Sequence, residues 1–123
     1  MDETAFESGT IFINGVEFDK VAAITWQKHA VFEGVFTKNL LLGKGLKAML
    51  VKIEPNCEIK NHVHEKEAEL HEVILGKGDA LVNQKSVPYT SGVISFIPSN
   101  TPHSVKADSC GLILLAKFTP SLA

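Results

Sequence analysis

Two histidines separated by one residue are the first feature of this chain that could carry chemistry. His62 and His64 lie in a segment that the sequence predicts to be a strand, and alternating strand side chains put both imidazoles on one face. Neutral imidazoles placed in this way can hold one ion together. A His-x-His pair by itself is more often an exposed polar strand face, so a metal site needs further ligands.

Two more side chains could supply those ligands. A short turn brings Glu69 onto the next predicted strand, where its carboxylate could join the histidines. His103 follows the rigid loop 98–102 at the start of another predicted strand. Imidazole and carboxylate ligands suit iron, manganese, nickel, zinc or copper, and they leave positions open for a small molecule. We therefore expect a divalent transition metal, whose identity the sequence leaves open.

His71 is a further candidate, because it shares strand parity with Glu69 and is expected to face the interior. It could be a catalytic acid or base in the pocket or a partner of a metal ligand. A hydrogen-bonded core histidine is an equally good interpretation, and His71 could also replace Glu69 as a ligand. His29 is expected at the surface, and Tyr89 at the pocket rim or in a dimer interface.

The composition excludes some classes of partner. Twelve basic and fourteen acidic residues give a net charge of −2 without a basic stripe, which argues against nucleic acid as a partner. No segment approaches the roughly 18 apolar residues that would span a bilayer. The N-terminus lacks the pattern of a signal peptide, and Cys57 and Cys110 form no paired motif. We expect a cytoplasmic protein with reduced, partly buried thiols.

The elements that must position these residues are short strands. Asn14-Gly15 between two apolar runs is typical of a type I′ hairpin. The remaining strands are predicted at 31–42, 47–53, 59–64, 69–75, 80–83, 93–97, 103–107 and 112–118, with turns between them. Many short strands at this spacing favour an all-β sandwich or barrel. Residues 112–116 are apolar on both faces, so they lie in mid-core or beneath another subunit.

Both metal-ligand segments resemble motifs of the cupin superfamily. The first cupin motif runs Gly, five residues, His-x-His, three or four residues, Glu, six residues, Gly. His62, His64, Glu69 and Gly76 match at these intervals, and Asn56 stands where the leading glycine usually is. Asparagine tolerates the left-handed conformation better than other non-glycine residues, so the exchange is mild.

The second cupin motif runs Gly, five residues, Pro-x-Gly, two residues, His, three residues, Asn. Gly92, Pro98 and His103 match it, with Asn100 for the second glycine and Ala107 for the final asparagine. The similar region covers residues 56–107 and keeps all four ligand positions of the family.

The resemblance implies one cupin domain over residues 1–123. Residues 1–10 show no clear pattern and are expected to form a loose arm. Its fold would be an antiparallel double-stranded β-helix, or jelly-roll barrel, often found as a homodimer. The family's metal ligands would be His62, His64, Glu69 and His103. Small cupins include dioxygenases, isomerases, lyases and proteins of polyuronate breakdown, so an enzyme is expected. The candidate inward residues are mainly apolar and no basic cluster accompanies them, which favours a compact, moderately polar substrate over a phosphate or polycarboxylate. A non-catalytic module that binds or senses a small molecule or a metal is the alternative, and the complete ligand set disfavours a metal-free structural barrel.

Overall fold

The structure, a computed structural model, describes residues 7–120 and consists almost entirely of β-strands. One short 3-10 helix, η1 (Val21–Ala23), interrupts them, and within the described residues no helix is long and apolar enough to cross a membrane. The strands are β1 (Thr10–Ile13), β2 (Val16–Lys20), β3 (Gln27–Lys28), β4 (Val35–Leu42), β5 (Lys47–Ile53), β6 (Glu58–His62), β7 (Glu67–Val82), β8 (Lys85–Thr90), β9 (Ile94–Ile97) and β10 (His103–Pro120).

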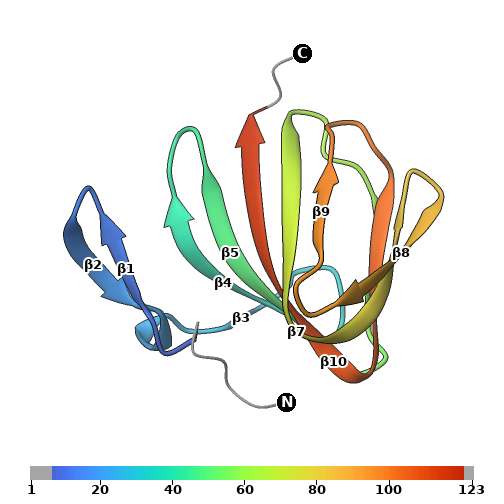
Figure 1. The fold of residues 1–123 in the computed structure, drawn as a ribbon, viewed down its shortest axis with the longest axis horizontal. Helices are drawn as coiled ribbons and strands as arrows, with labels where there is room; N and C mark the ends of the chain where they lie inside the picture. The colour runs from blue at the N-terminus through green and yellow to red at the C-terminus, as the bar shows by residue number, and fades with distance from the viewer. Residues whose placement is uncertain (1–6, 121–123) are drawn as a thin grey trace.

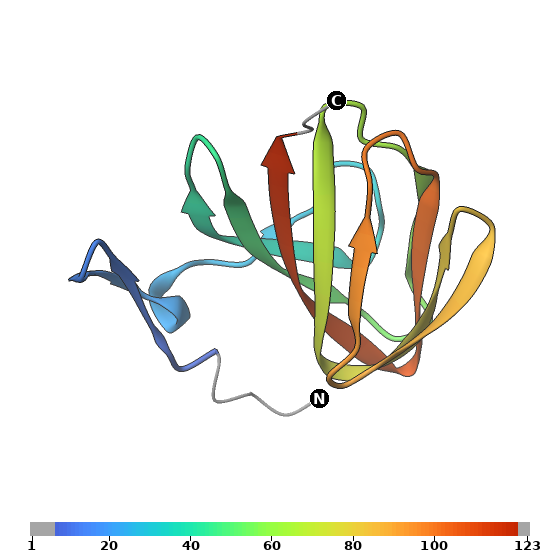
Figure 2. The same ribbon diagram turned by 45° about the horizontal axis from the view of Figure 1, so that its top comes forward.

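Eight of these strands form one curled antiparallel sheet. Its order is β3-β4-β5-β10-β7-β8, with β6 paired to β10 and β9 paired to β7. The sheet closes into a barrel in which β4 and β5 lie on one side, β8 and β9 on the other, and β7 and β10 run between them (Figures 1 and 2). This confirms the predicted all-β class and the jelly-roll barrel.

The turns predicted at 76–79 and 108–111 are wrong, because the long strands β7 and β10 run through these segments. Both segments stay within a strand, which bends there instead of ending. Gly76 has a φ of 89°, and the β7–β10 register shifts between Ala107 and Leu112. A bulge of this kind bends a strand without abolishing the pairing, and glycine permits the backbone conformation. Predicted strands 69–75 and 80–83 are therefore one element, as are 103–107 and 112–118.

Strand β8 was not predicted, and Pro88 lies in its middle. Proline cannot donate to a sheet ladder and is confined to strands with a free edge. In the structure β8 pairs with β7 and ends the strand order, so the proline occupies an edge.

The apolar strand at 112–116 separates two core layers. Leu112, Leu114 and Ala116 point into the barrel, whereas Ile113 and Leu115 belong to a second cluster outside it. That second cluster also contains Val21 and Trp26 from the N-terminal segment. The same chain thus covers the outer face of β10, leaving Ile113 and Leu115 3% and 6% exposed. No second subunit is required to explain this strand.

The N-terminal hairpin has the predicted turn. Asn14 and Gly15 take φ values of 51° and 77° between β1 and β2, as a type I′ turn requires. Of the expected loose arm, residues 1–6 lie outside the described residues, and β1 already begins at Thr10. The two strands form a separate sheet that stands beside the barrel (Figure 1).

Candidate metal centre

The four predicted ligands come from three neighbouring strands and the loop after one of them. His62 ends β6 and His64 follows it, Glu69 lies near the start of β7, and His103 begins β10. One ligand atom from each residue lies within 4.8 Å of the others. The structure therefore brings together all four side chains that the sequence singled out.

The separations within this cluster match those of ligands around one ion. Glu69 Oε1 lies 3.2 Å from His103 Nε2 and 3.5 Å from His64 Nε2. Neighbouring ligands that bind an ion at 2.0–2.2 Å are about 3 Å apart. The nitrogen and oxygen donors suit a borderline transition metal, so the residues present fit the expected group.

Backbone carbonyls orient two of the imidazoles. The Nδ1 atoms of His62 and His103 donate to the carbonyls of Lys60 and Thr101, each over 2.8 Å. A carbonyl oxygen can only accept, so Nδ1 must carry the proton in both rings. The Nε2 atom is left to face the cluster, which is the arrangement commonly found around ligating histidines.

Burial and hydrogen bonds set the charges of these ligands. Burial alone would raise the pKa of Glu69, but hydrogen bonds from His103 and His71 outweigh it and hold this pKa well below its ordinary value. Burial lowers the pKa of His103, but the hydrogen bond to Glu69 raises it and the net shift is upward. Burial lowers the pKa of His62 more than its backbone hydrogen bond raises it. The cluster thus contains a carboxylate anion and at least one imidazole favoured in its neutral, ligating form.

The two asparagines that replace motif glycines adopt left-handed backbone conformations. Asn56 has a φ of 63° and Asn100 a φ of 61°, which confirms that asparagine substitutes for glycine there. The backbone N–H of Asn100 also donates to the carbonyl of His64 over 2.9 Å. This bond ties the loop before His103 to the loop that carries His64.

His71 contacts the carboxylate oxygen of Glu69 that does not face His64 and His103. Its Nε2 is 2.6 Å from Glu69 Oε2, and its Nδ1 is 2.8 Å from the hydroxyl of Tyr89. His71 is 3% exposed and is absent from both the ligand cluster and the cavity wall. A catalytic role for it stays a prediction.

Tyr89 is fully buried, which corrects its expected place at the rim or in an interface. Its position follows from β8 lying against β7, with Tyr89 opposite Gly78. Burial raises the pKa of Tyr89 to about 12, against the opposing effect of a hydrogen bond with Ser95. Tyr89 therefore stays a neutral phenol beside His71.

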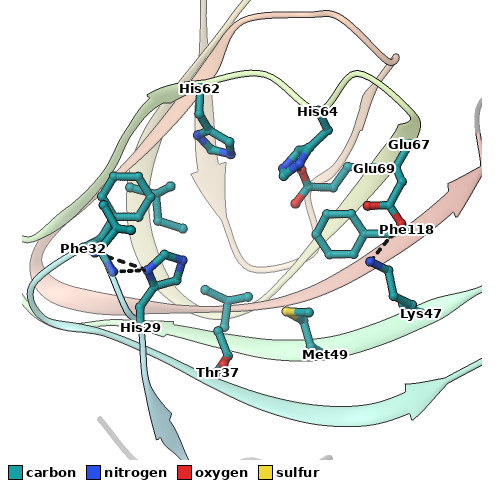
Figure 3. Close-up of a pocket in the computed structure, with 13 residues that line it drawn as sticks. His29, Phe32, Thr37, Lys47, Met49, His62, His64, Glu67, Glu69 and Phe118 are labelled. Carbon is teal, nitrogen blue, oxygen red and sulfur yellow. Dashed lines mark hydrogen bonds and ion pairs between the residues drawn. The ribbon is translucent and has the colours of Figure 1, made fainter.

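A cavity of about 420 Å³ adjoins the cluster. Figure 3 shows His62, His64 and Glu69 along one wall, with Met49 and Thr37 on the other side. Met49 and Val51 of β5 also line it, since alternate residues of a strand share one face. The other lining residues are His29, Val31, Phe32, Lys47, Ile59, Glu67 and Phe118.

Three ionisable residues of this wall were not predicted to line it. His29 was expected at the surface, but it is half-buried and faces the cavity. Lys47 and Glu67 form an ion pair of 2.9 Å at the other end of the pocket (Figure 3). Lys47 and Glu67 come from β5 and β7, while His29 follows β3, so no local motif joins them. Both cysteines are free thiols, as expected, but only Cys57 is half-buried, because Cys110 is exposed.

Comparison with known proteins gives relatives of the same architecture. The oxalate-binding protein of Thermotoga maritima is 34% identical over 56 residues, which are 46% of each chain. The match thus spans less than half the length of this curated relative. The structure of KdgF from Halomonas sp. superposes with a TM-score of 0.76 at 22% identity, covering 91% of this chain and 94% of the other.

A second solved structure is described as a predicted oxalate decarboxylase from Thermotoga maritima. It has a TM-score of 0.73 and 27% identity, covering 80% of this chain and 95% of that one. A family profile described as a cupin domain matches residues 49–114, which is more than half of the chain. With the barrel and a cluster that could hold a metal, these matches show that the chain belongs to the cupin family.

Proposed function

We propose that this cupin holds a divalent transition metal through His62, His64, Glu69 and His103, and binds a small organic molecule at that metal. One observation carries the proposal: four ligand atoms lie within 4.8 Å of one another beside an open cavity. Four protein ligands leave positions for a ligand atom from the cavity. When bound, the metal supplies Lewis-acid or oxygen chemistry.

The cavity supports a compact organic acid as the ligand. Its volume of about 420 Å³ lies at the lower end of the range for small-molecule sites. Its wall is mainly apolar, and the charge of Lys47 is offset by Glu67. The names of two similar proteins refer to oxalate, which points to a carboxylate oxygen as the group that would reach the metal.

Within this proposal the cupin is an enzyme of the dioxygenase, isomerase or lyase type. The apolar wall would exclude water from the bound molecule, and Glu67 and His29 are the wall residues able to exchange a proton. Binding without turnover is the second candidate. It is favoured by His71, which bonds Glu69 and does not line the cavity, and by the name of the oxalate-binding relative.

We further propose that the chain is a single domain that acts in the cytoplasm as a homodimer. The free thiols Cys57 and Cys110 suit a reducing compartment. The dimer is supported by apolar side chains of the β1–β2 hairpin, where Phe12, Val16 and Phe18 are 61–68% exposed. An exposed apolar patch of this kind is typical of an interaction site.

Metal content tests the central proposal. Protein purified without chelators, then loaded separately with iron(II), manganese, nickel, zinc and copper, should hold about one ion per chain in elemental analysis. Replacing His62 and His64 together with alanine should abolish this uptake, because two of the four ligands are lost. The β-sheet signal in circular dichroism should persist, since both residues lie at the end of a strand and in the loop after it.

His29→Asn is the matched control, because it changes a histidine of the same cavity outside the ligand cluster. It should retain the metal. Stoichiometric metal in the His62→Ala/His64→Ala protein would place the site elsewhere. Isothermal titration of the loaded and the metal-free protein with oxalate then tests ligand binding, and product analysis separates turnover from binding alone.

A further inference from the structure

We infer that His29 selects the ligand, by donating a hydrogen bond from Nε2 to an oxygen at the end of the molecule remote from the metal. This inference rests on the proposed function, because it assumes a ligand bound at the cluster of His62, His64, Glu69 and His103. It names a residue that lies 33 positions before the first of these histidines and belongs to neither cupin motif.

Two backbone amides determine which nitrogen of His29 carries the proton. The N–H groups of Val31 and Phe32 donate to Nδ1 over 3.0 and 3.2 Å. A nitrogen that accepts these bonds has no proton of its own. In the neutral ring the proton is therefore on Nε2, which makes Nε2 a hydrogen-bond donor.

That donor faces the cavity. Figure 3 shows His29 across the pocket from His64 and Glu69, with the ring edge opposite the amides turned to the interior. Within residues 7–120, Nε2 of His29 has no hydrogen-bond partner, whereas Nδ1 has two. A half-buried donor without a partner favours any ligand that brings an acceptor to it.

The loop that carries His29 is fastened at both ends. The backbone N–H of His29 donates to Val35 over 2.8 Å, and Glu54 N–H donates to Gly34 over 2.9 Å. Gly34 has a φ of 74° and packs so closely on Cys57 that a Cβ atom would overlap the sulfur. The imidazole is thus held in place before a ligand arrives, which a selective contact requires.

The other polar groups of the wall are less suited to this selection. Lys47 is 2.9 Å from Glu67, so its charge is already offset. The hydroxyl of Thr37 can donate or accept and does not impose one ligand chemistry. His29 presents a donor only, which indicates a small organic acid that carries a second oxygen acceptor, with an apolar section between its two ends.

Shape-matched acids test this inference on the zinc-loaded protein, which avoids redox turnover. One pair is 2-oxoglutarate and 5-methyl-2-oxohexanoate, and the other is 2-oxoadipate and 6-methyl-2-oxoheptanoate. In each pair an isopropyl group replaces the remote carboxylate while the metal-binding end stays the same. Calorimetric titration should show that wild type prefers the diacid of at least one pair by about tenfold, as expected for a hydrogen bond to a charged group.

His29→Asn should abolish that preference and leave the affinity for the isopropyl acid unchanged. The asparagine Oδ1 can still accept the amides of Val31 and Phe32, but the side chain no longer reaches the ligand. His29→Gln keeps a donor near the Nε2 position and should retain part of the preference. Thermal unfolding and zinc content show whether each variant is folded and loaded with metal. If His29→Asn does not fold, the preference between the acids is measured in His29→Gln and His29→Ala instead.

Three results would overturn the role of His29 while leaving the proposed function intact. The first is wild-type protein that binds both acids of each pair equally. The second is a preference that survives in His29→Asn, and the third is a preference that disappears in Lys47→Met. If zinc-loaded wild type binds none of the four acids and no oxalate, the proposed function itself fails, and the role of His29 fails with it.

Discussion

At the scale of the residue, Glu69 holds the centre of the site together. Its Oε1 faces His64 and His103, while its Oε2 is 2.6 Å from His71. One oxygen is thus available to an ion, and the other is held by a buried imidazole. We propose that His71 positions Glu69, and that Tyr89 positions His71 through the 2.8 Å bond to Nδ1.

Tyr89→Phe tests this chain of contacts at Tyr89, the member that does not itself contact Glu69. The variant removes one oxygen atom and leaves Nδ1 of the buried His71 without that partner, which should cost about 1–3 kcal/mol of stability. His71 would then hold the Glu69 carboxylate less firmly. The affinity for the metal should therefore fall by about tenfold, which is within the range found when partners of ligating residues are replaced. Competition with a coloured chelator measures the affinity for zinc, and thermal unfolding measures stability.

A buried control separates positioning from general loss of stability. Ile97→Val trims a core residue that is 1% exposed and should cost about 0.5–1.5 kcal/mol. It lies opposite Glu69 in the β7–β9 pairing but makes no hydrogen bond to the carboxylate. If Tyr89→Phe binds zinc no more weakly than Ile97→Val, Tyr89 has a packing role only.

Sequence reasoning reached the four ligands because strand parity and motif spacing are local properties. It placed His71 inside on the same parity, but it put Tyr89 at the pocket rim or in an interface and did not predict strand β8, which carries Tyr89. The role of His29 could not be predicted from the sequence. Its role depends on two backbone amides of its own loop and on a barrel wall contributed by β5, and neither is encoded in a spacing.

At the scale of the element, Gly76 allows β7 to bend and pair with different strands on its two sides. Residues before it pair with β9 and the second half of β10, and residues after it pair with β8 and the first half of β10. A Cβ atom at Gly76 would overlap the carbonyl oxygen of Gly111 across the strands. The glycine of the motif is thus needed for close backbone approach as well as for its positive φ.

Gly76→Ala should therefore be strongly destabilising. A non-glycine residue at this φ costs about 1–3 kcal/mol, and the overlap with Gly111 adds to that cost. Because each 1 kcal/mol lowers the melting temperature of a domain of this size by roughly 3–5 °C, the backbone strain alone should lower it by roughly 3–15 °C. Differential scanning calorimetry measures the shift.

Gly92→Ala is the control, with a similar φ of 94° but nothing within 4 Å of the added Cβ. It should lose less stability than Gly76→Ala, since it experiences backbone strain without the overlap. Equal losses in the two variants would show that the approach to Gly111 is unimportant. The turns predicted at 76–79 and 108–111 were wrong because both segments lie where the β7–β10 register shifts, so the two strands bend there and stay paired on either side of the bulge.

At the scale of the whole molecule, the hairpin of β1 and β2 is the part that the barrel does not explain. It forms its own two-stranded sheet beside the barrel (Figure 1), and an isolated hairpin is marginally stable in water. An apolar hollow lies between it and the main sheet, lined by Ile11, Phe12, Ile13, Leu40, Leu41, Ala48, Leu115 and Lys117. A second copy, presenting the same apolar surface, would cover it symmetrically.

This assembly predicts a particle of twice the chain mass of 13.4 kDa, or about 27 kDa, in light scattering coupled to size exclusion. Replacing Phe12 and Phe18 together with serine should give monomers, because both side chains lose apolar area that only a partner could bury. Phe96→Ser is the matched control, since Phe96 is 60% exposed against 61% and 62% for the hairpin residues but lies on β9. It should stay dimeric, and all three proteins should keep their metal. A wild-type particle of single-chain mass, or a Phe96→Ser protein that also dissociates, would show that the hairpin is not the contact between copies.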